Sequence, residues 1–166
     1  MHTTNTSIRA NLPAGDLTFG SMYEMSPFDN QLTVIELSGA ELRNVIAEQA
    51  HRGSVRVGLA GMRVDVECTG TDLSVTMRLT SGHEIGDSDS VTIAVANYLA
   101  LGGDRVFASV MPEGGYELQL DAPLVRDATI DWLQQQGGSL SESDFSSDDN
   151  PKWRLPANLD SECRLN

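Results

Sequence analysis

The sequence predicts an α+β domain, because several runs with strand periodicity accompany two segments with helix periodicity. Apolar and polar residues alternate in 32–37, 73–79 and 91–96, which is typical of half-buried strands. Apolar residues recur at helical spacing in two other segments, which begin near Ser38 and Asp121. A chain of 166 residues with 40% hydrophobic composition is long enough to bury one core.

The first predicted helix follows the strand 32–37. Ser38 with Glu41 three residues later forms a capping box, which indicates a helix start. Gly53 is expected to end this helix. We interpret its apolar stripe as core packing; the stripe consists of Leu42, Val45, Ile46 and Ala50.

The second predicted helix lies beyond an extended segment at 55–67, a polar turn region at 82–90 and a short apolar stretch at 106–111. Asp121 is the expected N-cap and Pro123 the expected first-turn residue. Its expected buried stripe and its stop signal are Leu124, Ala128 and Trp132, followed by Gly137 and Gly138.

Both ends of the sequence differ in composition from the middle. Residues 1–7 are polar, and we expect a disordered leader there; the domain itself then covers 8–138. Residues 139–166 begin with a low-complexity acidic segment, for which we expect a flexible tail. Trp153 and Leu155 either dock a last strand or belong to a disordered end.

The charge composition argues against binding to nucleic acid or to an anionic membrane. The net charge is −13, and Lys152 is the only lysine among eleven basic residues. Such a surface repels phosphate backbones, so an anionic small ligand requires locally clustered arginines. No apolar run approaches the roughly 18 residues needed to span a bilayer.

The residues that usually carry hydrolytic chemistry are scattered. His2, His51 and His83 have no helical pair spacing, and no metal-binding or nucleophile motif is present. We therefore expect no cofactor in this chain and no hydrolysis by this chain alone. Cys68 and Cys163 are too few to define a framework, so a disulfide and two unrelated thiols both stay open.

The strand 91–96 leads into the segment 97–104, which combines an aromatic ring, two glycines and a carboxylate. This order suits a flat heterocycle stacked on Tyr98 with a polar group held by Asp104, because glycine lets the backbone approach a ligand closely. The plainer alternative is a core tyrosine and a turn aspartate.

The segments 8–18, 23–30 and 37–42 precede it, and the four together resemble the C-terminal domain of the 5'-nucleotidase family. That family includes the bacterial periplasmic UDP-sugar hydrolase and the animal ecto-5'-nucleotidase. The likeness runs from about Ile8 to Leu133. It implies a layered α/β/β/α domain that binds substrate, with a pair of divalent metal ions on a separate N-terminal domain. We accordingly expect a fragment of a longer protein.

The resemblance also implies a set of substrate-binding residues. Arg9 stands where the family binds the phosphate or carboxylate end of the substrate, and Arg52 matches a second basic position more loosely. The alternatives are a surface arginine near a chain end for Arg9 and a cation at a helix C-terminus for Arg52.

On the nucleoside side, the resemblance implies two aromatic rings around the base. Tyr98 matches one ring, whereas Leu59 stands at the other position and Gly61 replaces a polar base contact. Asp104 matches a carboxylate that binds the nucleoside. The remaining members of the expected site are Asn97, Gly102 and Gly103.

Several departures put the substrate in doubt, although the fold prediction stands. Asp29 and Arg105 occupy positions where the family typically has glycine, and Phe28 is interpreted as a core residue. Two hypotheses follow. The first is a nucleotide- or sugar-nucleotide-binding domain of a periplasmic or extracellular 5'-nucleotidase-like metallophosphoesterase, with its N-terminal domain as partner. The second is a non-catalytic association domain whose nucleotide site has degraded.

Overall fold

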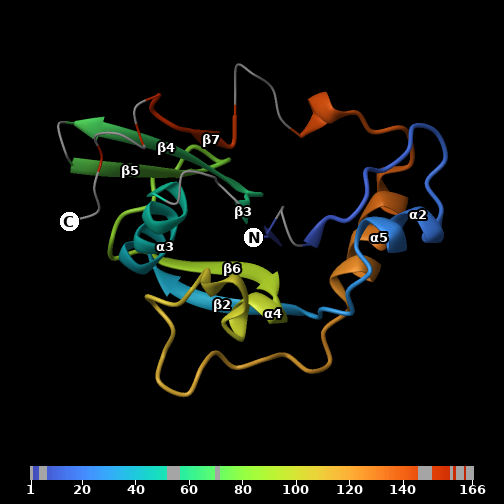
Figure 1. Cartoon of the computed structure of the whole chain (residues 1–166), viewed down its shortest axis with the longest axis horizontal. Helices are drawn as coiled ribbons and strands as arrows, with labels where there is room; N and C mark the ends of the chain where they lie inside the picture. Colours follow the sequence, from blue (N-terminus) through green and yellow to red (C-terminus); the bar gives the residue numbers. More distant parts are fainter. Residues whose placement is uncertain are drawn as a thin grey trace.

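The computed structural model describes residues 2–3, 7–51, 57–69, 72–145, 151–157, 159 and 163. The chain contains both strands and helices, and within these residues β3 to β6 follow one another without an intervening helix (Figure 1). In order, the helices and strands are β1 (His2–Thr3), α2 (Phe19–Met25), β2 (Leu32–Ser38), α3 (Gly39–His51), β3 (Val57–Gly58), β4 (Met62–Thr69), β5 (Asp72–Leu79), β6 (Ser90–Ala96), α4 (Asn97–Ala100), α5 (Val125–Gln136) and β7 (Trp153–Arg154), with short 3-10 turns at Gly103–Arg105 and Glu142–Asp144.

Two sheets form the centre of the domain. One has the strand order β5-β4-β7, with β5 antiparallel and β7 parallel to β4. The other pairs β2 with β6 in antiparallel register, so that Leu32 lies opposite Ala96. A third, two-stranded pairing joins β1 to β3. Strand β1 lies in residues 1–7, for which the sequence analysis expects a disordered leader. The α+β fold class is confirmed.

Helix α3 contacts strands of both larger sheets and lies between them in Figure 1. Its capping box is confirmed: the Glu41 carboxylate accepts from the Ser38 backbone N–H at 2.8 Å, and the Glu41 N–H donates to the Ser38 hydroxyl at 3.2 Å. Gly39 is required by packing, since a Cβ there would lie 1.8 Å from the carbonyl oxygen of Gly86. The expected apolar stripe of this helix is buried in the core.

The second predicted helix starts later than expected. Helix α5 begins at Val125 with Leu124 as its N-cap, so the assignments of Asp121 and Pro123 were wrong. The Pro123 carbonyl instead accepts from the N–H of Leu32 at 2.9 Å. Gly137 ends the helix in the left-handed conformation, as predicted.

The expected buried stripe of α5 is also corrected. Trp132 is 43% exposed and packs against Phe145, with ring centroids 6.0 Å apart. The buried residue of this helix is Arg126. The reason is its packing partner: α5 lies against the short helix α2, which the sequence analysis missed, at one side of the sheets (Figure 1).

The C-terminal segment is fastened to the sheet. Cys68 and Cys163 form a disulfide with a Cα–Cα distance of 5.7 Å, which selects one of the two alternatives left open by the sequence. Trp153 of β7 donates its indole N–H to the carbonyl of Val57 at 3.0 Å. In the part of the chain that the structure describes, no helix has the length and apolar character needed to cross a membrane.

Candidate functional site

Helix α4 and the 3-10 turn at Gly103–Arg105 follow β6 and bring three of the predicted site residues into contact. The Tyr98 hydroxyl donates to a carboxylate oxygen of Asp104 at 3.2 Å. The Tyr98 ring lies against Gly103, where an added Cβ would be 2.4 Å from the ring atom Cε1. The ring nevertheless stays 44% exposed, so it is not a core tyrosine. Tyr98, Gly103 and Asp104 therefore form one small unit at the surface, the Tyr98 loop.

The start and the turn of this loop are fixed by the backbone. The N–H of Asn97 donates to the Gln31 carbonyl at 2.8 Å, and its side-chain oxygen accepts from the Gln31 N–H at 3.2 Å. Gly102 has φ of +97°, which glycine adopts without strain. Asp104 and Arg105 also have positive φ, at 52° and 54°. Two non-glycine residues in this region indicate a strained turn beside the exposed ring.

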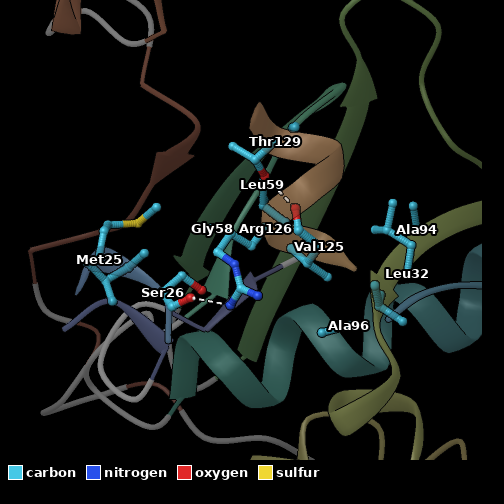
Figure 2. Close-up of a pocket in the computed structure, with 13 residues that line it drawn as sticks. Met25, Ser26, Leu32, Gly58, Leu59, Ala94, Ala96, Val125, Arg126 and Thr129 are labelled. Atoms are coloured by element: carbon cyan, nitrogen blue, oxygen red, sulfur yellow. Dashed lines mark hydrogen bonds between the residues drawn. The ribbon is translucent and has the colours of Figure 1, made fainter. Parts of the chain in front are cut away.

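A cavity of about 410 Å³ lies between the ends of β3 and β6, the segment after α2, and α5 (Figure 2). Most of its wall is apolar. The lining residues are Ile8, Met25, Ser26, Leu32, Gly58, Leu59, Ala60, Ala94, Val95, Ala96, Val125, Arg126 and Thr129. Among the predicted site residues, Leu59 contributes to this wall. Three other lining residues are each next in the chain to a predicted site residue: Ile8 to Arg9, Ala60 to Gly61, and Ala96 to Asn97.

Arg9 is exposed and held by the segment that follows α2. Its backbone N–H donates to the Met25 carbonyl at 2.8 Å, and its guanidinium carbon lies 5.2 Å from the ring centroid of Phe28. Phe28 is half-buried, so its interpretation as a core residue is corrected. Its ring makes a cation–π contact with the Arg9 guanidinium at the surface.

Gly61 lies in a turn between two strands. Gly61 is exposed with φ of +78°, and its carbonyl accepts from the Thr80 N–H at 2.9 Å, so its backbone conformation explains the glycine. Arg52 lies outside the described residues.

Arg126 is the residue that the sequence analysis missed. It is 6% exposed, and its Nη1 donates to the carbonyls of Ser26 and Phe28 at 3.3 Å each. Its Nη2 donates to the Asp29 carboxylate at 2.9 Å. The guanidinium also lies over Tyr23, 4.9 Å from the ring centroid. The sequence held no local signal for this burial, because Arg126 lies two residues after Leu124 and therefore on another face of the helix than the predicted stripe. A buried arginine requires partners, and here they come from the distant segment 26–29.

Within the described ranges, no three His, Cys, Asp or Glu side chains are grouped so that they could hold a metal ion. The site residues described above offer stacking, hydrogen bonding and cationic contacts. These are interactions that bind and orient a ligand.

A known domain family matches most of this sequence. The family model described as 5'-nucleotidase, C-terminal domain matches residues 2–111, which is more than half of the chain. The chain is therefore a member of that family.

Individual relatives agree with this assignment. Protein UshA of Yersinia enterocolitica is 26% identical over 97 residues, which are 58% of this chain and 18% of that protein. Endonuclease YhcR of Bacillus subtilis is 31% identical over 94 residues, which are 56% of this chain and 8% of that protein. The chain thus matches only a small part of the length of these relatives.

Solved structures show the same fold. The 5'-nucleotidase precursor from Thermus thermophilus superimposes with a TM-score of 0.66 at 20% identity, covering 92% of this chain and 31% of that one. The NAD nucleotidase of Haemophilus influenzae gives the same TM-score of 0.66 at 21% identity, covering 94% of this chain and 29% of that one.

Proposed function

We propose that this chain is a substrate-binding domain that holds a nucleotide or sugar nucleotide for hydrolysis elsewhere in a larger protein. The hydrolysis would occur at a divalent metal pair on an N-terminal domain of the 5'-nucleotidase type. The proposed location of that protein is periplasmic or extracellular. The name of the family and the names of the two structural neighbours, a 5'-nucleotidase precursor and an NAD nucleotidase, support a nucleotide substrate.

The Tyr98 loop is the observation that carries this proposal. An exposed tyrosine ring offers a face on which a nucleobase can stack, and Gly103 and Asp104 hold that ring in place. The Asp104 carboxylate accepts hydrogen bonds, so the same loop can bind a ribose hydroxyl or a base N–H. Stacking on an aromatic side chain contributes about 1–3 kcal/mol per base.

Arg9 is the proposed contact for the anionic end of the ligand. Its guanidinium presents paired N–H donors that match phosphate oxygens, and these bonds are stronger than neutral ones. A net charge of −13 makes such a local cation necessary. Leu59 offers an apolar wall in place of a second ring.

Calorimetric titration with AMP, adenosine and UDP-glucose tests the proposal. We expect Tyr98→Ala to weaken nucleoside binding about tenfold or more, since one stacking face is lost. Tyr98→Phe should retain most of the affinity because it keeps the ring.

Phe145→Ala is the matched control, since it removes an exposed aromatic ring from the Trp132 pair. Equal losses in Tyr98→Ala and Phe145→Ala would contradict a site at the Tyr98 loop. No detectable heat with any ligand at millimolar concentration would favour the second hypothesis, an association domain.

A further inference from the structure

We propose that Arg126 is a positioning residue that sets the place of Arg9 by clamping the segment 25–29. The inference rests on the proposed function, in which Arg9 binds the anionic end of the ligand. Arg126 and Arg9 come from opposite ends of the domain sequence, and the segment between α2 and β2 connects them.

The first link is the clamp on the segment. Arg126 projects from the first turn of α5 toward Ser26, as Figure 2 shows, and one guanidinium bonds the carbonyls of Ser26 and Phe28 and the side chain of Asp29. Three acceptors from four consecutive positions on one rigid planar donor fix the path of that backbone. Because the guanidinium is 6% exposed, water competes little for these bonds.

The second link joins the segment to Arg9. Among the described residues, two contacts support Arg9, and both come from this stretch: the Met25 carbonyl accepts its N–H at 2.8 Å, and the Phe28 ring lies 5.2 Å from its guanidinium carbon. Met25 precedes the first clamped residue, and the Phe28 carbonyl is itself clamped. A shift of the segment therefore moves both supports of Arg9 together.

The division of roles follows from exposure and from neighbouring charges. Arg126 is buried and both of its Nη atoms are bonded, whereas its Nε has no hydrogen-bond partner among the described residues. The Asp127 carboxylate lies 3.9 Å from that Nε, so an incoming anion would have to displace the Nη partners or approach this negative charge. Arg9 is exposed, and a cation–π contact does not use a lone-pair acceptor for its N–H groups. Arg9 can thus bind an anion while its position depends on Arg126.

The first experiment needs no ligand. Hydrogen exchange of the Arg9 amide, which is bonded to Met25, is compared in the wild type, Arg126→Gln and Asp29→Asn. We expect exchange about tenfold faster in Arg126→Gln and a smaller change in Asp29→Asn, which removes one charge-assisted bond only. Arg154→Gln is the control, because it removes an exposed arginine paired with Asp65. Unchanged Arg9 exchange in both test variants would overturn the inference.

The second experiment measures the ratio of AMP to adenosine affinity in Phe28→Leu, a variant that leaves the Arg126 clamp intact. We expect this ratio to fall about tenfold in Phe28→Leu and by a similar factor in Arg9→Gln. The double variant with both substitutions should show no further fall in the ratio. Adenosine affinity should stay constant. A full additional loss in the double variant would contradict action through Arg9. If the wild type binds neither ligand, the proposed function fails, whereas Arg9 exchange still decides the positioning role.

Discussion

Gly103 determines where the Tyr98 ring can lie. The ring rests directly on the Gly103 backbone, and an added methyl group would fall 2.4 Å from a ring carbon. Such a separation is far below van der Waals contact, so a side chain at this position must displace the ring. The glycine is explained by this close approach.

We predict that Gly103→Ala displaces Tyr98 and breaks its hydrogen bond to Asp104. Overpacking of this kind destabilises proteins by about 1–3 kcal/mol, but an exposed ring can rotate away, so the low end is expected. The measurement is the NMR chemical shifts of the Tyr98 ring protons together with the melting temperature. Gly138→Ala is the control, since no atom lies within 4 Å of a Cβ there. Ring shifts identical to the wild type would contradict the prediction.

Arg105 is a non-glycine residue in a glycine conformation. Its φ is 54°, and its side chain is exposed. The left-handed conformation costs a non-glycine residue about 1–2 kcal/mol. The sequence analysis noted that the family typically has glycine here, and the backbone now gives the physical reason.

We predict that Arg105→Gly stabilises the domain by up to about 1 kcal/mol, because relief of strain exceeds the added entropy of the unfolded chain. Chemical denaturation measures the change in the free energy of unfolding. Arg105→Ala removes the same charge but keeps a Cβ, so it should give no gain. A destabilised glycine variant would show that the Arg105 side chain holds the turn.

The capping box of α3 makes the stability of this helix dependent on pH. Hydrogen bonds from the backbone N–H and the hydroxyl of Ser38 lower the pKa of Glu41 from its ordinary value of 4.5. A lowered pKa in the folded state means that the unfolded state binds the proton more tightly. The contribution is therefore complete above pH 4.5 and is lost as the pH falls through the folded-state pKa.

We predict that Glu41→Gln flattens the acid limb of the stability curve. Glutamine can still accept from Ser38 but carries no titrating charge, so the variant loses part of the fall in stability below pH 4.5. Urea denaturation across the acid range up to neutral pH measures this, with Glu24→Gln as an exposed carboxylate control. An unchanged acid limb in Glu41→Gln would contradict the assignment.

The disulfide closes a long loop of the chain, with a sequence separation of 95 between Cys68 and Cys163. We predict that reduction destabilises the domain by about 2–5 kcal/mol, because the open chain has more conformational freedom when unfolded. Thermal unfolding with and without dithiothreitol measures the effect. The double variant Cys68→Ser, Cys163→Ser should melt at the temperature of the reduced wild type, and dithiothreitol should not change its melting temperature. Equal melting of oxidised and reduced wild type would contradict a formed bond.

Local patterns predicted some elements and long-range contacts decided the others. The start and the stripe of α3 follow from spacing within the helix itself. Helix α2 was missed because it buries one residue, Met22, so it has little apolar periodicity. The start of α5 was misplaced because tertiary bonds decide it: the Leu32 N–H donates to the Pro123 carbonyl, and the Val125 N–H donates to the Asn30 carbonyl.

The same distinction applies to the site. Tyr98 and Asp104 are six residues apart, and their contact could be anticipated from one motif. The bonds of Arg126 to Ser26 and Phe28 span 100 and 98 positions. No local pattern specifies such a pairing, so the burial of Arg126 was not predicted.

The whole chain carries a net charge of −13 over 166 residues, and this excess repels itself in the compact state. We predict that the melting temperature rises when the sodium chloride concentration is increased from about 0.01 M to about 0.1 M. Over this range the screening length falls from about 30 Å to about 10 Å. Exposed ion pairs such as Arg78–Glu84 weaken in salt but contribute little. Potassium chloride should act equally. A falling melting temperature over this range would mean that attractive pairs outweigh the repulsion.

The bond between Cys68 and Cys163 also divides the domain mechanically. Tension applied at the two chain ends passes through the sulfur atoms and bypasses everything from β5 to β7. The segment 2–68, with Arg9 and its support on Met25, bears the load and can be peeled away. The Tyr98 loop lies inside the covalent ring and is shielded from direct extension. Stretching would therefore remove the cationic part of the proposed site while the aromatic part stays within a closed loop.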